Sequence, residues 1–151
     1  MQSHRSQHYW MFALNLLLSA IVMYLVMFSM IDTVGEFYNN LNMVYMALMM
    51  VSPMAILMLL MMGSMYANRR LNFALHAGFA GLFILAFALI RMQGAIGDGQ
   101  FLRSMIPHHS GAVLMCREAS LSDPEIVALC AQIQRSQREE IEQMKRILER
   151  Y

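Results

Sequence analysis

Three long apolar runs dominate the first part of the chain. They cover residues 9–30, 41–62 and 71–90. Each run is close to the roughly 20 helical residues needed to cross the apolar core of a bilayer. Polar, turn-forming segments separate them, and a glycine-rich joint follows at residues 94–99. The first run is longer than the apolar core of a signal peptide and no cleavage motif of small residues follows it, so we expect it to be retained. The pattern predicts three transmembrane helices in a membrane domain of residues 1–93.

The remainder of the chain has a different, amphipathic pattern. Apolar positions recur at helical spacing over residues 100–119 and again over 124–148, with polar residues on the opposite faces. Between the two segments, Ser122 or Asp123 is a candidate N-cap. These signals predict two antiparallel helices, a hairpin domain of residues 100–151, and an all-α fold for the whole chain. A hairpin of this size buries little apolar surface alone, so we expect it to pack on a second copy, on the membrane helices or on a partner.

Composition supports the assignment to a membrane. The chain is 58% hydrophobic and 14% charged, whereas soluble domains average about 25% charged residues. Before Ile90 the charged residues are only Arg5, Asp32, Glu36, Arg69 and Arg70. The net charge is +1 and the basic residues form no patch, so we expect no nucleic-acid partner.

The basic residues of the short loops predict an orientation. The loop at 31–40 has no Lys or Arg, whereas the loop at 63–70 carries Arg69 and Arg70 and the N-terminal tail carries Arg5. Basic loops remain on the cytoplasmic side. We therefore expect a multi-pass protein of the inner (plasma) membrane with a cytoplasmic N-terminus, and three crossings then leave the C-terminal hairpin extracytoplasmic.

Methionine is unusually frequent, with 18 residues in 151. Seven of them recur at steps of three or four within and just beyond the second apolar run and fall within a helical sector of about 120°. They are Met43, Met46, Met50, Met54, Met58, Met61 and Met65. Two interpretations remain open. Methionine is an adaptable packing residue, and a row of thioethers can also bind Cu(I) or Ag(I).

The candidate chemistry lies at the start of the hairpin, in the segment Met-Ile-Pro-His-His of residues 105–109. On a helix Met105, His109 and Cys116 point in similar directions, and His108 and Met115 form an adjacent row. Imidazole and sulfur ligands together suit copper better than magnesium or calcium. We therefore predict a soft-metal site, with Cu(I) favoured and Ag(I) as an alternative.

The second helix of the hairpin adds to this set. Folding the hairpin about residue 123 brings Glu140 and Met144 within a turn of the first helix's ligands, and it brings Cys116 level with Cys130. The two cysteines have two alternatives, a disulfide in an oxidising compartment or a reduced pair of soft ligands. The candidate metal ligands are Met105, His108, His109, Met115, Cys116 and Met144.

The same residues resemble a known family. The segment Phe101–Met115, together with Asp123-Pro124 and the later Gln-x-x-Glu-Ile-x-x-Met pattern that ends at Met144, is similar to the domain of unknown function 305. Members of that family have a ferritin-like helical-bundle architecture and include periplasmic copper-binding proteins.

The resemblance implies metal-ligand roles for Met105, His108, His109 and Met115, with Met144 as a further candidate. It also implies that the hairpin is half of a ferritin-like four-helix bundle, which a homo-oligomer would complete. Cys116 and Cys130 depart from the family pattern, which has small apolar residues there.

The function expected from these observations is that of a membrane-anchored copper- or silver-binding protein in metal homeostasis or resistance. We do not expect an enzyme, because the chain has neither the Glu-x-x-His spacing of ferritin-like catalytic sites nor a group that would orient His109 as a base for Cys116. The alternative is a structural or regulatory membrane subunit whose hairpin mediates oligomerisation or partner docking.

Overall fold

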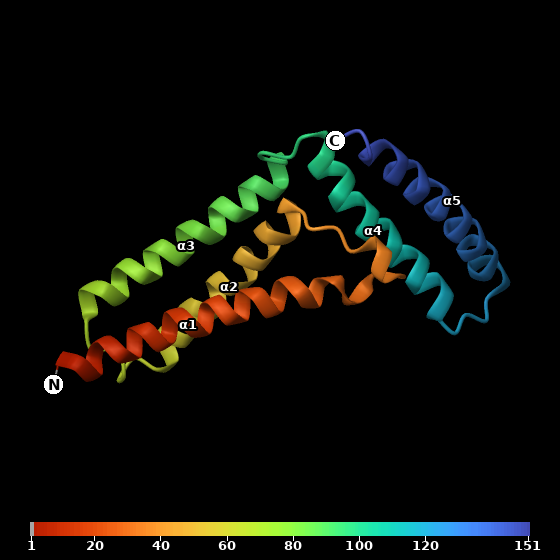
Figure 1. The fold of residues 1–151 in the computed structure, drawn as a ribbon. Helices are drawn as coiled ribbons and strands as arrows, with labels where there is room; N and C mark the ends of the chain where they lie inside the picture. The colour runs from red at the N-terminus through yellow and green to blue at the C-terminus, as the bar shows by residue number, and fades with distance from the viewer. Residues whose placement is uncertain (1) are drawn as a thin grey trace. The chain divides into compact units, whose positions relative to one another are not determined.

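The protein is described from a computed structural model, which defines residues 2–151 and their side chains from residue 7 onward (Figure 1). These residues form five α-helices and two short 3-10 helices and contain no strand, which confirms the all-α class. The elements are α1 Gln2–Val26, η1 Met27–Met30, η2 Val34–Glu36, α2 Leu41–Met61, α3 Arg69–Met92, α4 Asp98–Glu118 and α5 Pro124–Leu148.

Three helical segments are long and apolar enough to cross a membrane, namely Gln7–Met30, Leu41–Met61 and Arg69–Met92. Their ends lie within two residues of the apolar runs in the sequence. One detail differs from the prediction, because the first segment is not α-helical throughout. After Val26 it tightens into the 3-10 helix η1.

The chain divides into two compact units that are not consecutive in sequence. The first contains α1 together with Asn42–Ala95, and the second contains Met27–Leu41 together with Ile96–Tyr151. The buried residues at the centre of the first unit are Phe12, Leu16, Val51, Ala55, Leu59 and Tyr66. Met54 and Met58 of the methionine row pack against this cluster, whereas Met46, Met50 and Met61 are exposed.

In the second unit α4 and α5 run side by side in opposite directions. A disulfide joins Cys116 to Cys130 near the connecting turn, and the Tyr151 hydroxyl donates to Asp98 Oδ2 (3.1 Å) at the far end. The buried residues between the helices are Leu102, Ile106, Val113, Ile141 and Met144. The N-cap of α5 is Asp123, whose carboxylate accepts from the amides of residues 125 and 126 at 2.8 and 3.3 Å.

The segment of residues 27–41 packs on α4. Its Asp32 amide donates to the Ser110 hydroxyl (2.6 Å), and its Leu41 amide donates to the Gln100 side chain (3.0 Å). The loop after the first apolar helix is therefore part of the same unit as α4 and α5.

Candidate metal centre

The ligand-type residues of α4 surround Pro107, which lies inside the helix and is buried. Proline has no amide hydrogen, so the carbonyl one turn earlier, that of Arg103, loses its helical partner. The side-chain amide of Asn40, itself only 3% exposed, donates to this Arg103 oxygen at 3.4 Å. The 27–41 segment thus satisfies the carbonyl that the proline frees, and α4 continues as one helix through the Met-Ile-Pro-His-His segment.

The two histidines are placed differently. His108 is exposed and His109 is mostly buried, and their ring centroids are 5.9 Å apart. His109 Nδ1 is shielded from solvent and lies 2.9 Å from Glu140 Oε2 on α5. The distance is that of an ion pair, although the angle is not that of a hydrogen bond.

Glu140 is itself held by two neighbours on α5. The Ser136 hydroxyl donates to Oε1 at 3.1 Å, and the Gln137 amide donates to Oε2 at 3.3 Å. A carboxylate beside Nδ1 of a histidine favours the tautomer protonated there, and it leaves Nε2 free to bind a metal ion. In many metal sites the histidine N–H donates to such a carboxylate; Glu140 lies at that distance from His109 Nδ1 but not at the angle of a hydrogen bond.

Two methionine side chains belong to the same region. Met144 of α5 is 9% exposed and is part of the cluster between the helices. Met105 of α4 is partly buried and packs against that cluster. Met105 precedes His109 by one helical turn on α4, and Met144 follows Glu140 by one turn on α5, so the four side chains come from neighbouring turns of two paired helices.

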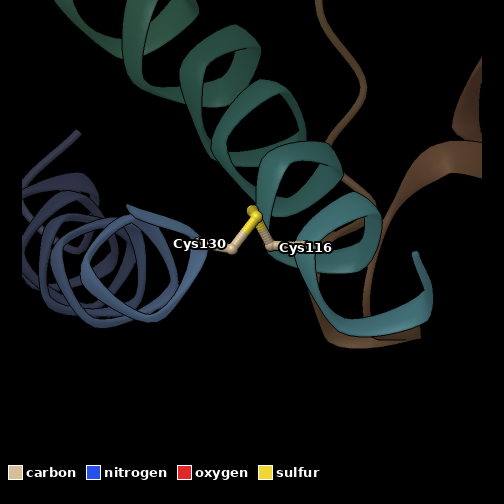
Figure 2. The surroundings of a disulfide bond; sticks show 2 residues. All are labelled: Cys116 and Cys130. Atoms are coloured by element: carbon tan, nitrogen blue, oxygen red, sulfur yellow. A yellow bond between two sulfur atoms is a disulfide. The ribbon is translucent and has the colours of Figure 1, made fainter. Parts of the chain in front are cut away.

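Other predicted ligands lie apart from this group. Met115 is 55% exposed near the end of α4. Cys116 is bonded to Cys130, with their Cα atoms 5.2 Å apart (Figure 2). Of the two alternatives for the cysteines, the structure contains the disulfide. In this form Cys116 has no thiolate, so we remove it from the set of metal ligands.

Among residues 7–151, no group of three or more His, Cys, Asp and Glu side chains is placed to hold a metal ion. His109 and Glu140 are a pair, and a metal site here would need thioether sulfur from methionine to complete it. The preference of such a site for a soft metal ion therefore depends on the sulfur atoms of Met105 and Met144.

The sequence reasoning missed a buried polar network beside this group. Glu36 is 8% exposed and accepts a hydrogen bond of 2.5 Å from the hydroxyl of Ser110, the residue after His109. Asp32, four residues earlier in the same loop, forms an ion pair with Arg117. The signal was present in the sequence, because two isolated carboxylates in a strongly apolar region require a partner.

Lys145 completes the network from α5. Its Nζ is 3.0 Å from Glu142 Oε1 and 3.8 Å from Glu36 Oε1. Burial lowers the pKa of this ammonium group, but the hydrogen bond to Glu142 and the charges of both carboxylates outweigh burial, and the pKa is raised. The network ties the 27–41 segment to both helices next to the histidines.

The fold and the site define an all-α chain with three helices suited to a membrane and a helix pair that carries histidine and methionine. Comparison with known proteins finds a family and a relative, neither of them with a described function. Residues 86–148 match the model of the family described as "Domain of unknown function (DUF305)". The chain is 33% identical over 120 residues to "Uncharacterized protein L153" of Acanthamoeba polyphaga mimivirus, across 78% of this chain and 77% of that protein. No solved structure matches the chain. The chain therefore contains a DUF305 domain in its C-terminal part and belongs to the same family as the viral protein.

Proposed function

We propose that this protein is a membrane-anchored copper- or silver-binding protein that serves metal homeostasis or resistance. The observation that carries the proposal is the contact of His109 on α4 with Glu140 on α5, with Met105 and Met144 one helical turn away on the same two helices and packed in the cluster between them. Thioether sulfur with imidazole nitrogen is a ligand set that selects Cu(I) and Ag(I) over harder ions. The role is one of binding rather than catalysis.

His108 and Met115 are the outer members of the proposed site. Both are exposed on α4, next to the inner group in sequence or one to two turns beyond it. In this proposal they make the first contact with an incoming ion, which then passes to the partly buried His109 and Met105.

The proposed location is the inner (plasma) membrane, with the N-terminus in the cytoplasm and the helix pair outside. Two observations support it. The Arg-Arg loop at 63–70 is separated from the acidic loop at 31–40 by one apolar helix. The 27–41 segment also packs on α4, so both lie on the same side, which agrees with α2 and α3 crossing the membrane and returning the chain.

We further propose a homo-oligomer, in which two helix pairs combine into a four-helix bundle of ferritin-like layout. Four apolar side chains near the connecting turn are exposed and available for such packing, namely Leu121, Ile126, Val127 and Leu129. A regulatory or structural subunit that oligomerises through this surface is the second candidate function. In that case the proposed ligands would serve only packing, and the protein would bind no metal ion.

The test is titration of the full-length protein in detergent with Ag(I), and with Cu(I) under anaerobic conditions. We expect binding by the wild-type chain and its loss in the double variant His108→Ala with His109→Ala. The matched control is His8→Ala, which removes an imidazole from α1 and should leave binding unchanged. Absence of binding by the wild-type protein, or equal binding by the double variant, would reject the proposal and leave the oligomerisation role.

A further inference from the structure

The disulfide lies where the second unit is least packed. Every residue from 119 to 129 is exposed. The buried residues of α5, Ile141 and Met144, lie toward its other end, and the last buried residue of α4 is Val113. The Cys116–Cys130 bond therefore joins the two helices at an end with little apolar core (Figure 2).

The two sulfur atoms are also within reach of small molecules. Both cysteines are only partly buried, and a cavity of about 290 Å³ lies against them. Its other lining residues are Ala119, Leu121, Val127, Ala131 and Gln134. This lining supplies one amide side chain and no carboxylate, so any ion held there would be bound by sulfur.

We propose that the Cys116–Cys130 pair is reversible and that its reduced form is a second soft-metal site, separate from the His/Met centre. A dithiol reductant transfers two electrons and two protons to the disulfide, which gives two protein thiols and the oxidised reductant. Each thiol then releases its proton as the two sulfur atoms bind one Cu(I) or Ag(I) ion. Thiolate is the softest ligand that proteins supply, and it favours these ions.

The backbone geometry suits this exchange. With metal–sulfur bonds of about 2.3 Å, a linear site needs its two sulfur atoms roughly 4.6 Å apart, against about 2.05 Å in a disulfide. The Cα atoms are 5.2 Å apart, within the usual disulfide range, and rotation of the two side chains to other staggered rotamers moves the sulfur atoms apart without moving the backbone. The exposed residues at this end allow the helices to separate slightly if rotation alone is insufficient.

The cysteine pair and the His/Met centre are distinct places on α4. Cys116 follows His109 by seven residues, which is about 10 Å along a helix. Oxidation and reduction of the pair would therefore change the number of ions held without removing the first site. The protein would hold more metal under reducing conditions and release part of it on oxidation.

The experiment compares the number of Ag(I) ions bound per chain before and after reduction. Full-length protein in detergent is reduced with a dithiol, freed of reductant anaerobically, dialysed against Ag(I) and analysed for metal content. We expect reduction to add about one ion per chain in the wild-type protein. The variant Cys116→Ser with Cys130→Ser should show no increment, and alkylation of the reduced wild-type pair should block the increment without any mutation.

The variant His108→Ala with His109→Ala separates this proposal from the proposed function. It should lose the ion bound in the oxidised state and keep the increment on reduction. If reduction adds no ion to the wild-type protein, or if the increment survives in both the serine variant and the alkylated protein, the second site does not exist. If this variant binds no ion in the oxidised state but still gains one ion on reduction, the inference of a second site at Cys116 and Cys130 stands.

Discussion

The contact between His109 and Glu140 gives the most specific prediction about the proposed metal centre. The perturbation is Glu140→Gln, which keeps the size of the side chain and removes its charge. The carboxylate lies 2.9 Å from Nδ1 of a histidine whose side chain is 14% exposed. A neutral amide no longer favours the tautomer that leaves Nε2 free, so the metal should bind less tightly.

The magnitude follows from the geometry. Removal of the group that orients a metal-binding histidine typically costs 10- to 100-fold in metal affinity, about 1.4 to 2.7 kcal/mol. Glu140 is 46% exposed, and the contact is not a linear hydrogen bond. Both facts place this pair at the lower end of that range of affinity losses, so we expect Glu140→Gln to lower the metal affinity about tenfold.

The assay is competition for Cu(I) against a chromophoric chelator, with the oxidised full-length protein in detergent. The matched control is Glu139→Gln, which makes the same charge change at the adjacent, exposed position. The reasoning predicts weaker binding for Glu140→Gln only. Equal affinities for the two variants would show that Glu140 acts only through its negative charge on α5 and not through its contact with His109, or that His109 is not a ligand.

Three further predictions concern the second unit. Ser110→Ala removes a hydrogen-bond donor from the buried Glu36 and should lower the free energy of local unfolding by about 2 kcal/mol. This loss should appear as about 30-fold faster hydrogen exchange across residues 27–41. Ser120→Ala, at an exposed position, should leave the exchange rates unchanged. Val113→Ala at a fully buried position should destabilise the helix pair by about 2 kcal/mol, and an unchanged thermal midpoint would contradict the packing described. Because the pKa of Lys145 is raised, its ion pairs stabilise the fold fully at pH values below the ordinary lysine pKa of 10.5. This stabilisation is lost as the pH rises through the raised pKa. The loss of stability at alkaline pH should therefore be smaller in Lys145→Met than in the wild-type protein.

The local elements of this fold could be predicted from the sequence. The ends of α5 were predicted correctly because its start carries two strong local signals, an N-cap at Asp123 and a proline at the next position. The three apolar helices were predicted for a similar reason, since length and hydrophobicity alone define them. Such features depend on residues that are neighbours in the chain.

The pairing of α4 with α5 was predicted to within about one helical turn. Folding the chain about residue 123 placed Cys116 opposite Cys130, as the structure has it. The same fold placed Glu140 within a helical turn of the ligands on α4, and in the structure Glu140 Oε2 lies 2.9 Å from His109 Nδ1. Which residue within that turn makes the contact depends on how the two helices cross, and periodicity along one chain segment does not determine this.

The contacts of the 27–41 segment could not be predicted. Glu36 and Ser110 are separated by 74 residues, and two apolar helices intervene. No periodicity links such positions, and only the burial of charge in an apolar region hinted at a partner. The oxidation state of the cysteines was also beyond the sequence, because it depends on the redox potential of the surroundings as well as on the distance between the sulfur atoms.

The most direct test of the central claim is X-ray absorption spectroscopy of the oxidised full-length protein loaded with one equivalent of Cu(I). The account predicts a mixed first coordination shell of thioether sulfur and imidazole nitrogen. The sulfur contribution should fall in the double variant Met105→Leu with Met144→Leu, which keeps the volume of both side chains. A shell of nitrogen and oxygen alone, or a sulfur signal that this variant leaves unchanged, would contradict a metal centre between α4 and α5.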